Sequence, residues 1–418
     1  MNHQVVIVGG GFGGLNVARG LKHAPAEVTL VDKRNYHLFQ PLLYQVATGG
    51  LSPGEIASPL RHVLEGNRNT RVWLAEVTGI DPDAHKLILG GRELPYDTLV
   101  LAAGSTNHYF GHDWHAVAPG LKSIEDATEI RSRILYAFEA AETETDSEER
   151  RAWLTFVLIG GGPTGVELAG ALGEIANDTL RHDFRSINPA EARILLLEGG
   201  PRLLTTFPPD LSEAAERALI RLGVRTRTNV LATDIDPDGV TICAGNETQR
   251  IRAKTVLWSA GVKPSPLGKL LVERTGAPLD KTGRVIVQPD LSVPGHPEIL
   301  VIGDLACVMQ DGQPLPGVAP VAIQEGKYVA RLIRERLTGE TPKPFRYWDK
   351  GNLATIGRKS AVADFGFIRF SGVFAWLAWL FIHLMYLVGF ENRLVVLIRW
   401  MYNYITRNRG ARLITGEK

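Results

Sequence analysis

The feature that most limits how this chain can fold is a glycine-rich loop that occurs twice, each time between a β-branched or apolar run and a helical segment. The first copy, GGGFGG, follows VVIV, and the second, GGGPTG, follows FVLI; their pattern glycines are Gly9, Gly11 and Gly14, and Gly160, Gly162 and Gly165. Such a loop lets the backbone turn tightly and brings a helix N-terminus to a pyrophosphate. In each copy the next expected strand ends on an acid, Asp32 or Glu198, whose carboxylate can accept hydrogen bonds from ribose hydroxyls.

A single glycine pattern also fits an ordinary turn, so its context carries the interpretation. The similarity between the copies continues downstream, where YDTLVLAAG (96–104) is echoed by AKTVLWSAG (253–261). We therefore expect an α/β fold with two Rossmann-like dinucleotide-binding domains and a C-terminal helical membrane-anchoring segment. The first domain is expected to be discontinuous. The expected boundaries are 1–120 and 277–340 for the first domain, 121–276 for the second, and 341–418 for the C-terminal segment.

Composition narrows the class of protein further. With 418 residues, 44% hydrophobic and 22% charged, the chain has room for two folded domains. The formal charge of +1 argues against a nucleic-acid-binding module, which usually forms a clearly basic domain. Cys243 and Cys307 lack the spacing of a redox pair or a metal site, so we expect reduced thiols and no bound metal. Because the N-terminus enters a strand at once, no signal peptide is expected, and the folded body is expected in the cytoplasm.

Two dinucleotide sites in one polypeptide favour electron transfer between a fixed and an exchangeable cofactor. The segment EILVIGDLA offers Asp304 after a buried strand as a partner for the ribityl chain of FAD, although IGD is also an ordinary strand-to-helix turn. The first loop is therefore expected to hold FAD and the second a nicotinamide nucleotide. Glu198 favours the ribose diol of NADH over the extra phosphate of NADPH, and Arg202 lies close enough in sequence to weaken that preference.

The expected cofactor contacts lie mostly in loops that follow strands. For FAD they are Gly9, Gly11, Phe12, Gly13, Gly14, Asp32, Lys33, Val77, Ala103, Gly104, Gly303 and Asp304. For NADH they are Gly160, Gly162, Pro163, Thr164, Gly165, Glu198, Ala260 and Gly261.

The order of GGGFGG, GGGPTG, LAAGS, WSAGV and VIGD resembles the two-dinucleotide-binding-domain flavoproteins over residues 2–336. Within that group the chain is most similar to the type II NADH:quinone oxidoreductases, the single-subunit, non-pumping NADH dehydrogenases. The specific resemblance lies in NYHLFQPLLYQVATG (35–49), GVAPVAIQEG (317–326), IGRKSAVADFG (356–366) and the apolar tail. It implies two-electron transfer from NADH through FAD to a membrane quinone of the ubiquinone or menaquinone type. Flavin disulfide reductases are disfavoured because no cysteine precedes Cys243, whereas a thiol role for Cys307 stays open.

The resemblance also implies roles for single residues. Glu167 matches a glutamate between nicotinamide and flavin, although a carboxylate in a first helical turn is equally favoured by the helix dipole. The family's quinone pocket usually has an alanine-glutamine pair and a second glutamine four residues later. Here Gln324 is present, but Pro320 replaces the first glutamine and has no donor, although it can still start a helix. Lys359 matches a lysine near the quinone tunnel, though a lysine is more often a solvated charge. The backbone amide near Ala322 would face the flavin pyrimidine oxygen.

The C-terminal region is expected to meet a membrane. Residues 372–390 carry no formal charge and are long enough to span a bilayer, with His383 as a tolerated packing residue. From Glu391 to Arg412 there are five arginines and one glutamate. Polar residues recur there at helical spacing opposite apolar ones: Asn392, Arg399, Asn403 and Arg407 against Leu394, Leu397, Ile398, Met401 and Ile405. The pattern favours a basic amphipathic helix in the membrane interface, with its arginines near the anionic leaflet and Trp376, Trp379 and Trp400 at headgroup level. A true span and a buried helix of a homodimer are the alternatives.

The expected protein is thus an NADH:quinone oxidoreductase at the cytoplasmic face of the cell membrane. A soluble NADH:ferredoxin-type flavin reductase would use the same glycine loops but has no use for the apolar tail. A low-turnover redox-sensing protein would bind FAD and NADH and scarcely react with any quinone.

Overall fold

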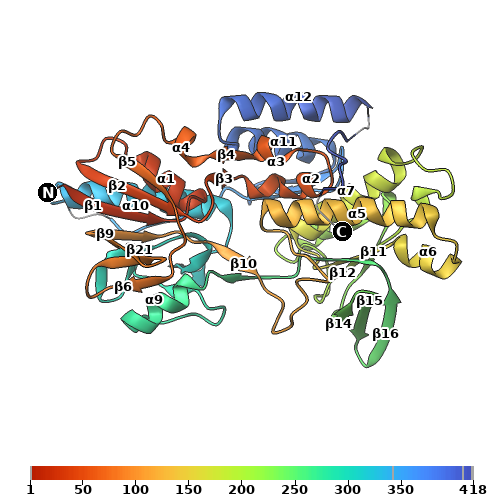
Figure 1. Cartoon of the computed structure of the whole chain (residues 1–418), viewed down its shortest axis with the longest axis horizontal. Coiled ribbons are helices and arrows are strands. Elements are labelled where there is room, and N and C mark those ends of the chain that lie inside the picture. The colour runs from red at the N-terminus through yellow and green to blue at the C-terminus, as the bar shows by residue number, and fades with distance from the viewer. Residues whose placement is uncertain (1, 341–342, 407–408, 416–418) are drawn as a thin grey trace. The chain divides into compact units, whose positions relative to one another are not determined.

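In the computed structural model, which describes residues 2–340, 343–406 and 409–415, the chain divides into two compact units (Figure 1). Unit 1 comprises residues 1–38, 57–106 and 262–350. Unit 2 comprises residues 39–56, 107–261 and 351–418. Each unit contains one of the two glycine-rich loops and one wholly or largely parallel sheet, so the expected α/β fold with two dinucleotide-binding sheets is confirmed.

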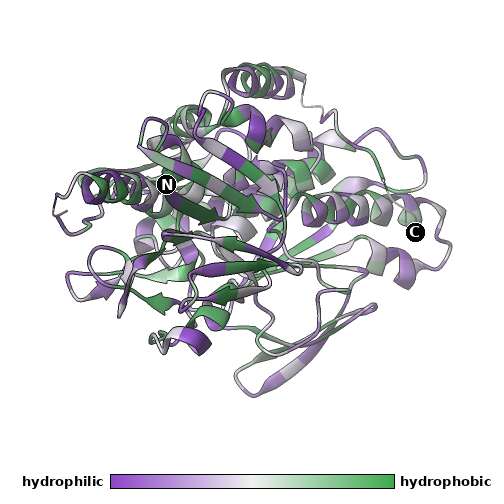
Figure 2. Cartoon of the chain, turned by 60° about the vertical axis from the view of Figure 1, so that its left-hand side comes forward, coloured by the Kyte–Doolittle hydropathy of each residue, from purple (hydrophilic) through white to green (hydrophobic). Residues whose placement is uncertain are grey.

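Unit 1 is built on a six-stranded sheet with the order β20-β21-β9-β1-β2-β5. The strands are β1 (His3–Val8), β2 (Ala26–Asp32), β5 (Thr70–Leu74), β9 (Thr98–Leu101), β20 (Ser292–Val293) and β21 (His296–Val301). All pairings are parallel except β20 with β21. Because both faces of a parallel sheet are covered, its strands are continuous apolar runs, and the residues from Val5 to Val8 are at most 5% exposed. Figure 2 shows green, hydrophobic strands near the N-terminus.

Helices α1 (Phe12–Gly20) and α10 (Ala319–Leu337) pack against each other in this unit. An antiparallel sheet of β6 (Gly79–Asp81), β7 (Lys86–Leu89) and β8 (Arg92–Pro95) interrupts the α/β order. The remaining elements are short: β3 (Tyr36–Leu38), β4 (Ala57–Pro59), α4 (Leu60–Val63), β10 (Ser105–Asn107), β18 (Val262–Pro264), α9 (Leu267–Thr275), β19 (Val285–Ile286), β22 (Ala306–Cys307), β23 (Met309–Gln310) and β24 (Gln313–Pro314).

Unit 2 repeats the plan with a four-stranded parallel sheet in the order β13-β12-β11-β17. Its strands are β11 (Thr155–Ile159), β12 (Arg193–Leu197), β13 (Val224–Arg227) and β17 (Thr255–Trp258). An antiparallel sheet follows, made of β14 (Leu231–Asp236), β15 (Gly239–Ala244) and β16 (Glu247–Arg252). The helices are α2 (Leu43–Ala47), α3 (Pro53–Ile56), α5 (Ile124–Thr143), α6 (Ser147–Trp153), α7 (Pro163–Glu174) and α8 (Pro209–Arg221), and a π-helical turn covers Ile175–Thr179.

The C-terminal part of unit 2 is a three-stranded sheet followed by two helices. The sheet consists of β25 (Asn352–Thr355), β26 (Ala361–Asp364) and β27 (Arg369–Ser371). The apolar run forms α11 (Val373–Tyr386), whose 14 residues are about 21 Å long. The expected amphipathic segment forms α12 (Phe390–Thr406); Arg407 lies outside the described residues. Of the helices in the described parts of the chain, none combines the length and apolar character needed to cross a bilayer.

The two faces of α12 have different environments. In Figure 2 the helix contains both green, hydrophobic residues and purple, hydrophilic ones. Its apolar stripe is exposed by between 42% and 73%, at Leu394, Leu397, Ile398, Met401 and Ile405. Its polar stripe faces the protein: Arg399 Nε donates to Glu55 Oε1 (3.1 Å), and Asn403 Nδ2 donates to the carbonyl oxygen of Gly50 (3.0 Å). The amphipathic pattern is therefore confirmed, but its apolar face is the one that points away from unit 2.

The described tail arginines have partners within the protein, which the sequence did not predict. Arg399 pairs with Glu55, Arg409 with Glu174, and Arg412 with Asp183. The side chain of Arg393 donates to the carbonyl oxygen of Leu387 (2.8 Å). The sequence shows the number of cations in the tail, but their partners lie more than two hundred residues away along the chain, or in a preceding turn.

The tryptophans expected at headgroup level are also packed against unit 2. Trp379 is 3% exposed, and its ring stacks on His383 at a centroid distance of 4.3 Å. Trp400 Nε1 donates to Gln45 Oε1 (2.7 Å), and Trp376 stacks on Tyr404. Burial lowers the pKa of His383 to about 4, so a neutral imidazole fills this space, in agreement with the expected packing role.

Candidate functional site

The two glycine-rich loops have nearly the same geometry, although they lie in different units. Gly9 and Gly160 adopt φ angles of +104° and +106°, a region that side chains disfavour. A Cβ on Gly14 or Gly165 would lie 1.9 Å from the carbonyl oxygen of Gly9 or Gly160. Both patterns therefore require glycine because helix and strand meet too closely for a side chain. The two loops were expected to be copies of one structure, and their geometry agrees with that expectation.

In each unit, the acidic residue at the end of the second strand fixes the glycine-rich loop by hydrogen bonds. Asp32 Oδ2 accepts a hydrogen bond from Gly10 N (2.6 Å), and Oδ1 accepts one from Arg34 N (2.7 Å). Glu198 Oε2 accepts from Gly161 N (2.6 Å), and Oε1 accepts from Gly200 N (2.6 Å). Each carboxylate thus fixes its loop and keeps a negative charge where a ribose diol would bind.

Both loops have room for a pyrophosphate. Helices α1 and α7 begin after Gly11 and Gly162, and neither has a side-chain cap. Apart from its chain neighbours and the backbone of its own helix, a Cβ placed on Gly11 or Gly162 would have no described atom within 4 Å. A helix N-terminus without a side-chain cap and with open space before it fits a dinucleotide. Phe12, Gly13 and Gly14 lie in the first turn of α1, and Pro163, Thr164 and Gly165 in that of α7.

In unit 1, the expected FAD residues after β9 and β21 come together through Asp304. Ser105, which follows Ala103 and Gly104, donates its hydroxyl to Asp304 Oδ2 (2.6 Å). Sequence reasoning missed Glu325, which is 1% exposed and accepts a hydrogen bond from Gly303 N (2.6 Å). Burial raises the pKa of Glu325 to about 8. The glutamate directly after Gln324, in the same motif, was the available signal.

The other expected FAD residues take varied positions in unit 1. Lys33 is exposed directly after β2, whereas Val77 is 8% exposed between β5 and β6. The amide of Ala322 already donates to the carbonyl oxygen of Val318 (3.3 Å). Burial raises the pKa of the Cys307 thiol, as for a structural cysteine.

Arg202 does not lie free beside Glu198. Its Nη1 donates to the carbonyl oxygens of Leu204 and Phe207 and to Ser212 Oγ, and its Nη2 donates to the carbonyl oxygen of Thr205. The guanidinium therefore holds the segment before α8 together. The other NADH residues expected after β17, Ala260 and Gly261, follow Ser259, whose hydroxyl bonds the carbonyl oxygen of Gly160 (2.9 Å).

Glu167 lies inside unit 2, on the helix that starts at the second glycine loop. It is 9% exposed, and burial raises its pKa to about 8. The amide of Thr355 donates weakly to Oε1 (3.4 Å), and the indole N–H of Trp379 lies beside the carboxyl without the geometry of a full hydrogen bond. The first turn of α7 contains no acid, so the expected position of Glu167 in that turn was wrong. The helix dipole therefore does not account for this carboxyl group.

Two glutamines of unit 1 hold consecutive residues of one segment. Gln324 donates to the carbonyl oxygen of Trp348 (2.9 Å) and accepts from its amide (3.0 Å). Gln310 does the same for Tyr347, at 3.2 Å and 2.8 Å. Pro320 stands in the first turn of α10, as expected for a proline that starts a helix. The Gln324 amide is thus engaged with the backbone, and Pro320 offers no donor.

Lys359 lies in unit 2 in the turn between β25 and β26. Its φ is +69°, and its ammonium group lies 5.2 Å from the centroid of the Tyr404 ring. The lysine is therefore held by an aromatic face of α12.

A cavity of about 90 Å³ lies in unit 2 among α2, α7, α11 and α12. Its aromatic wall consists of Tyr44, Trp376, Trp379, Trp400 and Tyr404. Its polar lining includes Glu174, whose carboxylate pairs with Arg358 and with the buried Arg409. Trp379 lines this cavity and also adjoins Glu167. An apolar space with a few fixed polar groups is typical of a small-molecule site.

Comparison with known proteins gives consistent matches along the chain. The family described as pyridine nucleotide-disulphide oxidoreductase matches residues 3–326, and the NDH2 C-terminal domain matches residues 349–408. The type II NADH:quinone oxidoreductase NdhA of Mycobacterium tuberculosis is 48% identical over 427 residues, with 99% of this chain and 90% of the relative covered. The type II NADH:quinone oxidoreductase Ndh of the same organism is 46% identical, with coverages of 100% and 91%. NDH2 from Plasmodium falciparum in complex with NADH has a TM-score of 0.88 at 21% identity, with both chains fully covered, and shares the fold.

Proposed function

Since the chain belongs to the type II NADH:quinone oxidoreductases, we propose that FAD is the flavin through which its electrons pass. The enzyme transfers two electrons from NADH to a quinone without pumping protons. NADH yields two electrons and one proton as a hydride, and the quinone takes up two electrons and two protons. One further proton therefore comes from the medium, and the products are NAD⁺ and quinol.

The observation that best supports the site is the position of Glu167. This carboxyl group lies on α7, the helix of the second glycine loop, and adjoins Trp379 on the apolar helix α11. Because its pKa is raised to about 8, the group holds a proton at neutral pH. We propose that Glu167 orients the substrates and delivers that proton on the quinone side.

The residues of unit 1 fit FAD and are proposed to hold it. Bound FAD would supply a two-electron carrier between a hydride donor and a quinone. The first glycine loop would bind the pyrophosphate, Asp32 the ribose, and Asp304 the ribityl chain. Ser105 and Glu325 hold Asp304 and Gly303 in place through the hydrogen bonds they make. We also propose the domain boundaries expected from the sequence: 1–120 and 277–340 for the FAD domain, 121–276 for the NADH domain, and 341–418 for the C-terminal segment.

The residues of unit 2 are proposed to select NADH over NADPH. Glu198 presents a fixed carboxylate to the ribose, and Arg202 is committed to the segment before α8. A 2′-phosphate would therefore meet the negative charge of Glu198, which the engaged Arg202 guanidinium is not free to balance.

The aromatic cavity of unit 2 is the proposed place of entry for the quinone head group. Part of its wall comes from the apolar helix α11 and the amphipathic helix α12, and one wall residue, Trp379, adjoins the proton-holding Glu167. We also propose that Lys359 and Gln324 act on the quinone side of the site. Gln324 would act through the Trp348 segment that it holds.

The exposed apolar stripe of α12 is proposed to lie in the membrane interface at the cytoplasmic face. On α11 a second exposed row contains Phe374, Leu377, Phe381 and Met385. Apolar side chains arranged in this way on two neighbouring helices favour a membrane surface over water. The alternative is that these apolar rows are buried between the two subunits of a homodimer.

Anaerobic stopped-flow with the purified full chain tests the proposal. Flavin absorbance is followed while the protein is mixed first with NADH and then with ubiquinone or menaquinone analogues. We expect fast bleaching by NADH and fast recovery with one quinone class. The cofactor released on denaturation should be FAD. Recovery that is equally slow with every quinone would contradict the assigned acceptor site, and release of FMN would contradict the flavin.

A further inference from the structure

His37 is a buried histidine beside the first glycine-rich loop. It lies on β3, is 2% exposed, and its Nδ1 is 2.9 Å from the carbonyl oxygen of Gly10. A carbonyl oxygen can only accept a hydrogen bond, so Nδ1 carries the proton and donates to Gly10. Burial lowers the pKa of His37 to about 4, so the ring is neutral at neutral pH and Nε2 carries no proton. The contact with the loop therefore fixes one tautomer of the ring.

Gly10 is thus held at both of its backbone polar groups. Its N–H donates to Asp32 Oδ2 (2.6 Å), and its carbonyl oxygen accepts from His37. The peptide bond between Gly10 and Gly11 is trans, so its C=O and N–H point in opposite directions. The Gly11 N–H consequently points away from the imidazole. Gly11 is exposed and directly precedes α1, where a helix N-terminus favours a pyrophosphate.

The second glycine-rich loop holds the corresponding peptide group without a histidine. The carbonyl oxygen of Gly161 accepts from the amide of Leu204 (2.8 Å), and the Gly161 N–H donates to Glu198 Oε2 (2.6 Å). The acid is common to both loops, whereas the donor to the carbonyl oxygen is a backbone amide in unit 2 and the His37 side chain in unit 1. Every residue except proline supplies a backbone amide, but only a side chain with an N–H in the right place can replace His37.

The packing around His37 would also suit an apolar side chain. β3 pairs with β4, where His37 lies opposite Ser58, and the Phe12 ring meets the imidazole edge to face at a centroid distance of 5.2 Å. Leucine would fill a similar volume and would bury no unpaired acceptor. What the imidazole adds at this place is therefore its hydrogen bond to Gly10.

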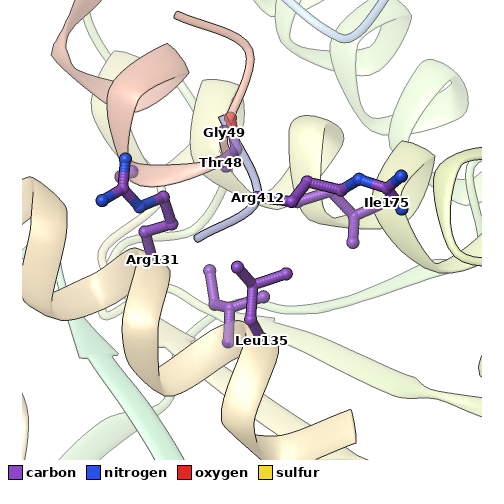
Figure 3. Close-up of a pocket in the computed structure, with 8 residues that line it drawn as sticks. Thr48, Gly49, Arg131, Leu135, Ile175 and Arg412 are labelled. Atoms are coloured by element: carbon purple, nitrogen blue, oxygen red, sulfur yellow. The ribbon is translucent and has the colours of Figure 1, made fainter. Parts of the chain in front are cut away.

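The other ring nitrogen, Nε2, has no hydrogen-bond partner in the described parts of the chain. The same holds for Nε of Arg131 in unit 2, which borders a mostly apolar cavity of about 10 Å³ (Figure 3). That cavity has room for at most one water molecule. An unpaired buried nitrogen alone therefore marks no ligand, and the role of His37 follows from its paired Nδ1.

We propose that His37 is a positioning residue for the flavin: it holds the Gly10 carbonyl group so that the Gly11 N–H donates to the pyrophosphate of FAD. This inference rests on the proposed assignment of FAD to the first loop. Without the donor, the Gly10–Gly11 peptide group is free to rotate, and the anion loses an oriented N–H. The second loop has its own donor in the Leu204 amide and should be unaffected.

FAD binding by two variants tests this inference. His37→Leu removes the donor, whereas His37→Asn keeps an N–H on the atom that corresponds to Nδ1. The Kd for FAD is measured with the purified full chain, by diluting the holoenzyme and following the fluorescence of the released flavin. We expect His37→Leu to raise this Kd about 10-fold, as for one lost hydrogen bond to an anion, and His37→Asn to stay within about 3-fold of the wild type.

Two further measurements separate positioning from packing. The Kd for NADH, taken from flavin reduction at saturating FAD, should be the same in the wild type and both variants. A packing role would lower the Tm of both variants and weaken their FAD binding to an equal degree, and this result would overturn the inference. Wild-type Kd values for FAD in both variants would overturn it as well.

The wild-type protein decides if a variant does not fold. Nitrogen NMR of the imidazole rings should show His37 with its proton on Nδ1, and a proton on Nε2 would overturn the inference. The proposed function fails by a different result, which is release of FMN or of no flavin when the wild type is denatured. Release of FAD together with unchanged Kd values in the variants contradicts the role of His37 alone.

Discussion

Gln324 holds Trp348 by both backbone hydrogen-bonding groups, as donor to its carbonyl oxygen and as acceptor from its amide. This pair of bonds uses one of the two N–H donors of the glutamine amide and fixes the direction in which the second N–H can donate. The Trp348 side chain itself is 74% exposed, so the glutamine fixes a backbone from which a large aromatic ring projects.

Gln324→Ala and Gln310→Ala form a matched pair, because each removes two hydrogen bonds from the same segment. We expect each to lower the free energy of unfolding by about 1–3 kcal/mol. If Gln324 acts by positioning Trp348, both variants should change the quinone KM to a similar and modest degree. Steady-state NADH:quinone kinetics and chemical denaturation measure the two effects. A much larger KM increase in Gln324→Ala alone would indicate direct contact between Gln324 and the quinone.

Glu167→Gln should slow quinone-dependent flavin reoxidation by about 10²-fold, since it removes a positioned proton donor. Flavin reduction by NADH should change much less. In the wild type, reoxidation should fall as pH rises through about 8, where the carboxyl ionises, and the variant should lose this dependence. Stopped-flow at a series of pH values separates the two half-reactions. Equal slowing of both halves would assign Glu167 a structural role.

The same carboxyl should affect stability in a defined pH range. The folded state keeps the Glu167 proton up to about pH 8, whereas the unfolded chain loses it near the ordinary value of 4.5. The unfolded state therefore binds fewer protons within this range, and stability falls as pH rises. Each pKa unit corresponds to about 1.4 kcal/mol. We expect the Tm of the wild type to fall relative to that of Glu167→Gln between about pH 5 and 8. Glu325 is present in both proteins and cancels in the comparison.

Glu198→Gln should weaken the preference for NADH over NADPH by about 10-fold, because the carboxylate that repels a 2′-phosphate is removed. The ratio of kcat/KM for the two nucleotides is the measurement. Arg202→Ala should leave that ratio unchanged and lower Tm, because its guanidinium bonds the segment before α8. A gain of NADPH selectivity from Glu198→Gln that depends on Arg202 would show that this arginine does reach the nucleotide.

The double variant Ile398→Glu, Met401→Glu should reduce cosedimentation with lipid vesicles, since both side chains belong to the exposed stripe of α12. Leu231→Glu is a suitable control, because Leu231 is 63% exposed on β14. NADH-dependent flavin bleaching should be kept in both proteins. Because the described tail arginines have partners within the protein, binding to neutral and anionic vesicles should be similar. Strong dependence on anionic lipid would contradict this mode of binding.

Local pattern was sufficient to predict the two sheets and their loops. Gly14 and Gly165 meet a backbone oxygen a few residues away, so the requirement for glycine is visible in the sequence. The environment of the arginines was not predictable in this way. Arg399 pairs with Glu55, and Arg409 pairs with Glu174. The spacing of residues 391–412 does not predict either partner. Periodicity shows that α12 has two faces, but it does not show which face the protein covers.

Glu325 shows a second limit. Neighbouring residues in one motif point to different sides of a helix, and the burial of Glu325 depends on α10 lying against the loop at Gly303. From the sequence alone, a glutamate is expected to be solvated. The raised pKa of Glu325 results from its burial in the folded protein.

Unit 2 is built from segments that are far apart in the sequence, and this affects the order in which its parts become available during synthesis. A ribosome produces residues 39–56 early and Arg409 late, yet Tyr44, Glu174 and Arg409 line one cavity. The nascent chain must therefore keep Glu174 without Arg358 and Arg409 until these later residues have been synthesised. The apolar rows of α11 and α12 are also translated late, after the residues of both nucleotide-binding sheets. The order of synthesis thus delays these exposed apolar rows until the rest of the molecule is available to support them.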